Sequence, residues 1–394
     1  MYNNLLALRA KGTPNMDLAD LFKLAEQPDV ISFAGGFPDP DWFIEEIEEI
    51  TMDVLRNYKD IALQYSPVAG LSTLRKYISE RMRKQNMNIN PSNVLISSGS
   101  LQGLDLLCKI FLDPDDYVII EAPTYLGAIS TFESYEANTV AIPCDEHGII
   151  IEQLDEFLQN TKIKPKFIYV IPTFQNPSGR VWSLERRKAL LEICDKYQLP
   201  IIEDNAYGEL RCSGMEVPTI KSLDSKELVI YLGTFSKIFC PGIRLGWVAG
   251  PEEIIEKLIL FKQNSDQTSS SLSQLLVLEA GKKGLIEKQI NINIENLKLK
   301  RDVTINTLEK HFSGKAKWVV SEGGYYTWVE IDKKINTYDL LKKAVGDYKV
   351  AYVAGPSFFP NKNGGENCLR LCYSLPKPTK LEEGIKRLAK VFSI

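Results

Sequence analysis

The sequence predicts an α/β protein with a mainly parallel sheet covered by helices on both faces, followed by a smaller α+β module. From about residue 94 onwards, short and nearly continuous apolar segments alternate with segments whose apolar residues recur at helical spacing. Near the C-terminus, residues 323–331, 350–356 and 367–373 have the pattern of strands, with helices between and after them. A chain of 394 residues can bury a large core and divide into two domains.

The expected division gives residues 1–50 to an N-terminal arm and part of the small domain, residues 51–285 to the large domain and residues 286–394 to the small domain. Strands are expected at residues 94–100, 116–125, 167–172, 199–207 and 228–232, and another apolar run ends at Gly250. Helices are expected after Leu71, after Ser100, after the N-cap residue Ser183 and after Ser269. A long charged helix should then continue to about residue 310.

Composition excludes several classes of protein. A net charge of −4 gives no electrostatic footprint for nucleic acid or an anionic membrane, and no apolar run approaches the roughly 18 residues of a spanning helix. The first residues lack the pattern of a signal peptide, and the seven cysteines include no CxxC pair, so we expect a cytoplasmic protein with reduced thiols. The two histidines allow neither a histidine dyad nor a His-rich metal site.

Polar residues stand where the predicted strands of the large domain end. Ser100, Tyr125, Asn176, Asp204 and Lys237 each come just after such a strand. In open parallel sheets, ligands bind at the carboxyl ends of the strands. We therefore expect these five side chains to lie around one crevice.

Lys237 is the residue around which this crevice is organised. It follows the strand at residues 228–232 through a turn of small and hydroxyl residues, and Arg244 lies seven residues further on. A lysine at the mouth of a buried turn can lose its proton and attack a carbonyl, which favours Schiff-base chemistry. The alternative is an exposed turn lysine without a chemical role.

The other residues supply what a lysine needs to act on a ring aldehyde that carries a phosphate. Asp204 can keep a pyridine nitrogen protonated, Asn176 and Tyr207 can reach a phenolic oxygen, and Tyr125 can stack on the ring. The Ser-Gly-Ser turn that ends at Ser100 precedes a helix and suits a phosphate. Thr234 and Lys237 can join it there, with Arg244 as the charged partner of the phosphate.

Five short motifs occur along the chain in a fixed order: SFAGGFP from Ser32, LQYSP from Leu63, NPSG from Asn176, EDNAY from Glu203 and TFSK…RLGW from Thr234. In these motifs the chain resembles the pyridoxal-phosphate-dependent aminotransferases of fold type I, class I/II. The resemblance extends from about Ile31 to the C-terminus. It is strongest for the subgroup that contains 2-aminoadipate and kynurenine aminotransferases and the enzyme-like half of MocR regulators.

This resemblance implies a role for each matched residue. Lys237 would form the Schiff base with pyridoxal 5′-phosphate and move the substrate proton, assisted by Asp204 and Tyr207. The residues implied to bind the cofactor are Gly99, Ser100, Leu101, Tyr125, Asn176, Asp204, Tyr207, Thr234, Lys237, Arg244 and, from the neighbouring subunit of a homodimer, Tyr65. Those implied to bind the substrate are Gly36, Asn176 and Arg370.

Two residues leave questions within this resemblance. The subgroup usually has Gly-Ser-Gln where this chain has Gly99-Ser-Leu101, so Leu101 can assist the phosphate only through its backbone N–H. Arg370 alternates with apolar neighbours in its predicted strand, and a half-exposed sheet arginine is the alternative to a carboxylate-binding role.

The expected activity is transfer of an amino group from an amino acid to a 2-oxo acid such as 2-oxoglutarate. Aromatic, 2-aminoadipate-like and branched-chain donors all remain open, although the leucine-rich arm and Phe37 are candidates for shaping the side-chain pocket. One alternative is a C–S lyase that uses the same cofactor for β-elimination. Another is a non-catalytic MocR-like ligand sensor, against which stand Lys237, Asp204 and the lack of an expected DNA-binding module at residues 1–30.

Overall fold

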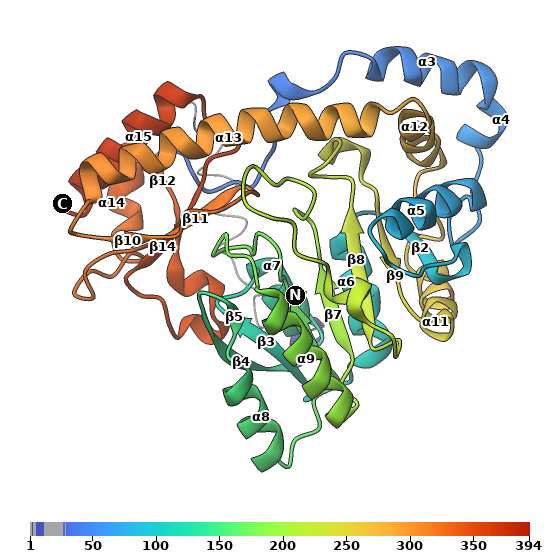
Figure 1. Cartoon of the computed structure of the whole chain (residues 1–394), viewed down its shortest axis with the longest axis horizontal. Coiled ribbons are helices and arrows are strands. Elements are labelled where there is room, and N and C mark those ends of the chain that lie inside the picture. The colour runs from blue at the N-terminus through green and yellow to red at the C-terminus, as the bar shows by residue number, and fades with distance from the viewer. Residues whose placement is uncertain (1, 3–4, 12–26, 28) are drawn as a thin grey trace.

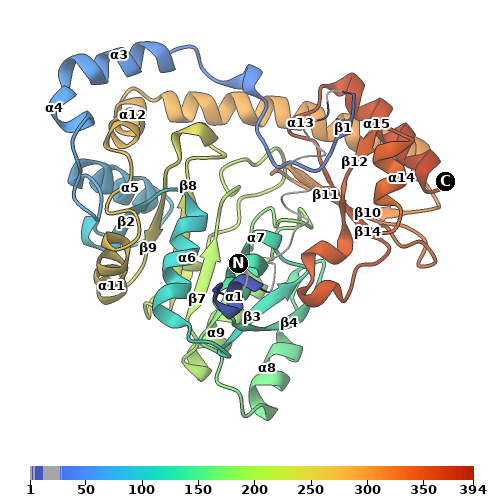
Figure 2. The same ribbon diagram turned by 180° about the vertical axis from the view of Figure 1, so that it is seen from behind.

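The computed structural model describes residues 2, 5–11, 27 and 29–394. The expected N-terminal arm therefore lies largely outside the described residues. Its described part includes the helix α1 (Leu8–Lys11), which lies against α7 (Leu126–Ser134). Figures 1 and 2 show the chain from opposite sides.

An eight-stranded sheet forms the centre of the molecule, in the order β2-β9-β8-β7-β6-β3-β4-β5. The strands from β8 to β4 are parallel to their neighbours, whereas β9 is antiparallel to both β2 and β8, and β5 is antiparallel to β4. The mainly parallel sheet predicted from the sequence is thus confirmed. Its strands are β2 (Val94–Ser97), β3 (Tyr117–Ala122), β4 (Asn138–Asp145), β5 (Gly148–Ile149), β6 (Phe167–Val170), β7 (Ile201–Asp204), β8 (Val229–Thr234) and β9 (Gly246–Ala249).

Helices cover both faces of this sheet because alternate residues of its strands are apolar on both sides. On one face, Leu104, Phe132 and Leu258 pack against the strands from α6 (Ser100–Phe111), α7 and α11 (Glu252–Gln263). On the other face, Leu154, Leu190 and Ile220 do so from α8 (Ile151–Asn160), α9 (Leu184–Tyr197) and α10 (Ile220–Leu223). The N-cap predicted for α9 is confirmed, since the Ser183 hydroxyl accepts a hydrogen bond from the Arg186 N–H.

The other α-helices among the described residues up to residue 285 lie beyond one edge of the sheet (Figure 1). In α5, which forms where a helix was expected after Leu71, the side chains Leu74, Ile78 and Met82 are buried. The helices beyond that edge of the sheet are α3 (Ile47–Asn57), α4 (Lys59–Ala62), α5 (Ser72–Lys84) and α12 (Ser271–Lys282).

The long charged helix is α13 (Leu285–Phe312), about 42 Å long at 1.5 Å per residue, which reaches from α12 to α15 (Figure 1). Beyond it lies an antiparallel sheet in the order β10-β11-β14-β13. The C-terminal elements are β10 (Lys317–Trp318), β11 (Tyr326–Glu330), α14 (Leu341–Gly346), β12 (Val350–Ala351), β13 (Val353–Ala354), β14 (Cys368–Cys372) and α15 (Pro378–Val391). The expected division at residues 50 and 285 stays a prediction.

One predicted strand is wrong as a single element. Residues 350–356 form two short strands, of which β12 pairs with β1 (Ile31–Ser32) and β13 pairs with β14. The chain then turns into a 3₁₀ helix, Gly355–Phe358. Pro356 has no N–H for a strand ladder, which is why the extended run stops there.

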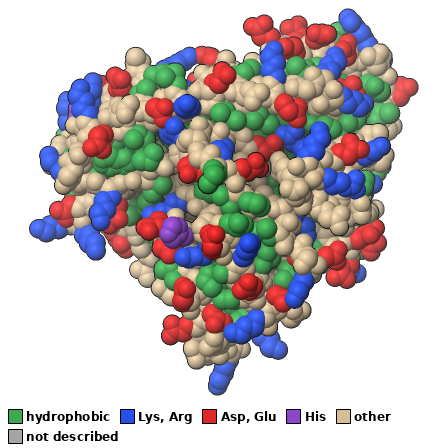
Figure 3. All heavy atoms as spheres, viewed as in Figure 1, with side chains coloured by type: hydrophobic (Ala, Val, Ile, Leu, Met, Phe, Trp, Pro, Cys, Tyr) green, Lys and Arg blue, Asp and Glu red, His purple; other side chains and the backbone are tan. Residues whose placement is uncertain are grey.

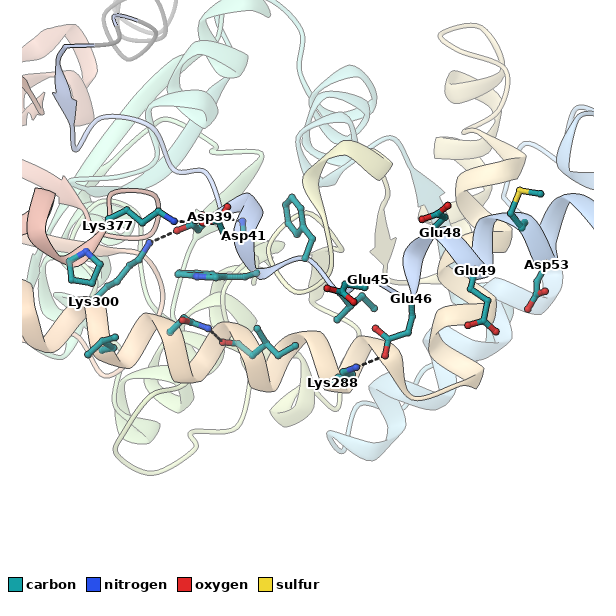
Figure 4. A pocket seen from close by; sticks show the side chains of 18 of the residues that line it. Asp39, Asp41, Glu45, Glu46, Glu48, Glu49, Asp53, Lys288, Lys300 and Lys377 are labelled. Atoms are coloured by element: carbon teal, nitrogen blue, oxygen red, sulfur yellow. Dashed lines mark hydrogen bonds and ion pairs between the residues drawn. The ribbon is translucent and has the colours of Figure 1, made fainter.

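A hollow of about 1100 Å³ lies between α3 and α13 (Figure 4). At one end of it, the Lys300 ammonium donates to Asp39 Oδ2 at 2.8 Å and to the Ser374 carbonyl at 2.8 Å, and lies 4.4 Å from the centre of the Trp42 ring. Lys300 therefore joins three parts of the chain: the segment before α3, α13 and the segment after β14. Among the described residues, further short 3₁₀ helices are Pro40–Trp42, Pro91–Asn93, Pro241–Ile243 and Pro360–Lys362.

Charges of both signs are interspersed on the face seen in Figure 3, and acidic side chains gather over α3 at its upper right. This distribution agrees with the small net charge of −4. Among the helices of the described residues, none has both the length and the apolar character that crossing a bilayer requires.

Candidate functional site

A cavity of about 350 Å³ opens at the carboxyl ends of the parallel strands. It brings together the residues that follow the predicted strands, as the topology of the sheet requires. The site residues predicted from the sequence that line it are Gly36, Gly99, Ser100, Leu101, Tyr125, Asn176, Asp204, Tyr207, Thr234, Lys237, Arg244 and Arg370.

Lys237 follows β8 and faces this cavity. Its Nζ donates a hydrogen bond to the carbonyl of Gly36 at 2.7 Å and lies 5.8 and 5.6 Å from the ring centres of Tyr207 and Tyr325. The pKa of Lys237 is lowered to about 8, mainly by burial and to a smaller extent by the positive charges of Arg370 and Arg244. A substantial fraction of the amine is thus neutral near physiological pH, as a nucleophile must be.

Asp204 is the last residue of β7 and is buried at the floor of the cavity. The hydroxyl of Tyr169 donates to its Oδ2 at 2.7 Å, while Oδ1 is buried without a hydrogen-bond partner. Burial raises the pKa of Asp204 to about 6, and the hydrogen bond from Tyr169 opposes this rise. An unpaired carboxylate oxygen in a cavity is suited to a cationic N–H donor.

Arg370 lies on β14 and is buried, so the alternative of a half-exposed sheet arginine is wrong. Its Nη1 donates to Asn176 Oδ1 at 2.8 Å and its Nη2 to the carbonyl of Ala34. The guanidinium lies between two rings, 4.4 Å from the centre of Tyr326 and 5.0 Å from that of Phe358. Its Nε is buried without a partner, and a planar guanidinium of this kind binds carboxylates in bidentate fashion.

The opposite end of the cavity has the features of an anion site. Gly99 has a φ of 95° and precedes Ser100, the first residue of the twelve-residue helix α6, whose N-terminal N–H groups have no side-chain cap. Arg244 Nη2 donates to the Ser98 carbonyl at 3.2 Å, and a Cβ on Gly99 would lie 2.8 Å from that nitrogen. A glycine here lets the backbone and the guanidinium approach the same point.

The model for aminotransferase class I and II matches residues 28–388 of the chain. The chain belongs to the class I and II aminotransferases. It is 41% identical to an aromatic-amino-acid aminotransferase of Thermococcus litoralis, over 99% of this chain and 94% of that protein.

Solved structures of aminotransferases are similar to this chain over nearly its whole length. A kynurenine aminotransferase of Pyrococcus horikoshii has a TM-score of 0.95 and 38% identity, covering 99% of this chain and 97% of that chain. An α-aminoadipate aminotransferase of Thermus thermophilus, solved with N-(5′-phosphopyridoxyl)-L-leucine, has a TM-score of 0.92 and 33% identity, covering 100% of this chain and 98% of that chain. The fold and the family expected from the five motifs are therefore confirmed.

The cavity of this aminotransferase fits pyridoxal 5′-phosphate in its donor set. The free Oδ1 of Asp204 suits a protonated ring nitrogen, and the turn at Gly99 with Arg244 suits a phosphate. Lys237 provides the amine. No group of histidine, cysteine, aspartate or glutamate side chains suited to a metal ion occurs among the residues that the structure describes.

Two predicted residues differ from the others in position. Tyr65 is 73% exposed and does not line the cavity, and its role in a neighbouring subunit stays a prediction. Leu101 lines the cavity with an apolar side chain that is 44% exposed, so its side chain adds no polar group to the anion site. The next residue, Gln102, is committed elsewhere: it binds the Ser98 N–H and the Asp266 carboxylate.

Three residues at the site were missed from the sequence. Ser236 lines the cavity and contacts Arg244 at 3.4 Å, and its place in the TFSK motif was an available signal. Tyr326 also lines the cavity, where its hydroxyl lies 2.9 Å from that of Tyr207. Tyr169 lies within an apolar strand and gave no sequence signal.

Proposed function

We propose that this aminotransferase transfers an amino group between an amino acid and a 2-oxo acid, such as 2-oxoglutarate, with pyridoxal 5′-phosphate as cofactor. The observation that carries the proposal is that Lys237, Asp204, Arg244 and Arg370 all line one cavity. The cavity thus has an amine, an acceptor for a ring N–H, an anion site and a second cation. When bound, the cofactor withdraws electrons from the substrate Cα and stabilises negative charge there.

We propose that residues at the cavity's anion end hold the phosphate. Gly99, Ser100 and Leu101 would offer backbone N–H groups at the start of α6, and Thr234 and Arg244 would add a hydroxyl and a charge. The left-handed φ of Gly99 and the close approach of Arg244 support this assignment.

The ring would lie between these residues and the floor of the cavity. Asp204 would accept the hydrogen bond of the ring nitrogen, and Tyr125 would stack on the ring. Asn176 and Tyr207 would donate to the phenolic oxygen. The Asn176 oxygen already binds Arg370, which leaves its NH₂ group as the donor.

Lys237 would hold the cofactor and then move a proton. Once the substrate amine has displaced it, the neutral Nζ of Lys237 would accept the proton of the substrate Cα and donate it to the former aldehyde carbon of the cofactor, on the other side of the substrate nitrogen. The lowered pKa of Lys237, about 8, supports this use as a general base near neutral pH.

Arg370 would bind the substrate α-carboxylate, with Asn176 and Gly36 beside it. The donor class stays open among aromatic, 2-aminoadipate-like and branched-chain amino acids. A donor panel with 2-oxoglutarate as acceptor, followed by glutamate formation, would rank these classes.

A homodimer is part of the proposal, with Tyr65 reaching the phosphate in the neighbouring subunit. Apolar side chains are exposed along the same short segment: Ile61 at 47% and Leu63 at 65%. An exposed apolar stretch beside an exposed tyrosine supports an interface. Light scattering at several concentrations would measure the assembly state, and Tyr65→Phe should weaken cofactor binding without dissociating the dimer.

The variant Lys237→Ala tests the activity. We expect it to lose both the visible absorbance of the lysine-bound cofactor and the transfer of amino groups to 2-oxoglutarate. Equal absorbance and rate in this variant would refute the proposal. The C–S lyase alternative gives a different result: sustained release of ammonia and pyruvate from a cysteine conjugate without any 2-oxo acid.

A further inference from the structure

The carboxylate of Asp204 is held by a single hydrogen bond. Its Oδ2 accepts from the Tyr169 hydroxyl at 2.7 Å, and its buried Oδ1 has no partner among the described residues. We propose that Tyr169 is a positioning residue: it binds Oδ2 so that Oδ1 stays ionised and aimed at the N–H of the cofactor ring. This inference rests on the proposed function.

The position of Tyr169 in the sheet directs its hydroxyl to Asp204 Oδ2 as its acceptor. Tyr169 lies on β6 and pairs in register with Ile202 on β7, two residues before Asp204. Its side chain is fully buried, and its ring packs edge-on against Phe132 with ring centres 5.7 Å apart. Because a buried hydroxyl without a partner is costly, the contact with Asp204 also fixes the carboxylate's orientation.

The groups that face Asp204 come from several elements. Tyr169 projects from β6, Lys237 from the turn after β8 and Tyr125 from the start of α7. Burial raises the pKa of Tyr125, so this phenol stays neutral. Among these three groups only Lys237 can bring a positive charge, and its own pKa is lowered to about 8, mainly by burial.

The ionisation of Asp204 is therefore sensitive to small changes of its pKa near neutral pH. Burial raises its pKa to about 6, and the hydrogen bond from Tyr169 is the largest influence that lowers it. Removing that donor should raise the pKa further, so the carboxyl would bind a proton over a range where the wild type is ionised. Below its pKa, Asp204 cannot pair with a cationic ring nitrogen.

The test measures the dissociation constant of pyridoxal 5′-phosphate for the full-length, cofactor-free protein at several pH values between 5.5 and 8.5. In Tyr169→Phe the ring and its packing remain, and only the hydroxyl is lost. We expect the variant to bind about fivefold more weakly than wild type at pH 6 and within about twofold at pH 8.5, which corresponds to a pKa shift of about one unit. Using the ratio of variant to wild type cancels the titration of the cofactor itself.

Three controls separate this role from a general structural one. Tyr135→Phe removes a similar hydrogen bond, from Tyr135 to Asp105 at 2.9 Å, away from the cavity, and should leave the affinity ratio near one. The side chain at position 204 cannot ionise in Asp204→Asn, so it should contribute no pH dependence to the dissociation constant of this variant. Tyr169→4-aminophenylalanine keeps a donor at the same place and should restore the wild-type profile, even if Tyr169→Phe folds poorly.

The outcomes are distinct. An affinity ratio that falls with rising pH and is restored by the amino analogue supports the inference. A ratio of one at every pH, or an equal loss at every pH, overturns it while leaving the proposed function intact. Failure of the wild type itself to bind the cofactor overturns the proposed function and this inference with it.

Discussion

The pH at which Lys237 becomes reactive can be worked out from its surroundings. Its Nζ has a carbonyl acceptor at Gly36, lies in a buried cavity and has Arg370 and Arg244 nearby, and its pKa is lowered to about 8, mainly by burial. At pH 7, about 10% of such an amine is neutral, compared with about 0.03% of a lysine with an ordinary pKa near 10.5. The reactive fraction of Lys237 should thus exceed that of a free lysine by about 300-fold.

Capture of pyridoxal 5′-phosphate by the cofactor-free protein measures this difference. The rate of the absorbance change after mixing, followed from pH 6 to 10, should rise about tenfold per pH unit up to about 8 and then level off. Nα-acetyl-lysine in the same buffers serves as the reference, because the titration of the cofactor affects both reactions equally. Borohydride reduction and peptide mapping would place the label at Lys237, and Lys237→Ala should give no fast phase.

The pH at which the capture rate levels off distinguishes a lowered pKa of Lys237 from an ordinary one. If the rate kept rising tenfold per unit to pH 10, in parallel with acetyl-lysine, the amine of Lys237 would have an ordinary pKa. The argument from burial would then be wrong, even if the enzyme proved active.

Two further predictions concern other parts of the molecule. Lys300→Met leaves the buried carboxylate of Asp39 (Figure 4) without its cation, and we expect the free energy of unfolding to fall by about 3–5 kcal/mol. For 394 residues this corresponds to a fall of about 4–6 °C in melting temperature. The control is Lys377→Met, which removes one partner of the exposed pair Lys377 and Asp41, and equal melting temperatures for the two variants would contradict this prediction. Leu101→Gln adds an amide donor beside the anion site and should lower the dissociation constant of the cofactor roughly three- to tenfold in a fluorescence titration. The control Leu101→Ala should not lower this dissociation constant. A dissociation constant of Leu101→Gln equal to that of the wild type would show that the introduced amide does not reach the phosphate.

Residues at strand ends were the predictable part of the site. Tyr125, Asn176 and Lys237 each follow a strand of the parallel sheet, and the parallel topology alone places the carboxyl ends of those strands together. Their positions needed only the order of apolar and polar segments. The family motifs then supplied roles that the pattern could not.

Contacts that depend on register or tertiary packing could not be predicted. Tyr169 reads as one more apolar residue of a buried strand, and only the pairing of β6 with β7 places its hydroxyl on Asp204. Lys300 belongs to a helix whose charges suggest a solvated face, yet Trp42 and Asp39 from a distant segment cover it. In both cases the partner comes from a part of the chain that local periodicity does not describe.

Burial acts in opposite directions on the two central groups of the cavity, and their partners determine the result. It raises the pKa of Asp204 and lowers that of Lys237, which favours the neutral form of each. Asp204 receives a donor, the Tyr169 hydroxyl, which stabilises its charge. Lys237 faces the cations Arg370 and Arg244, which disfavour its charge. Above about pH 8, one cavity can thus hold an ionised carboxylate and a mainly neutral amine together, the pair of states that the proposed reaction requires.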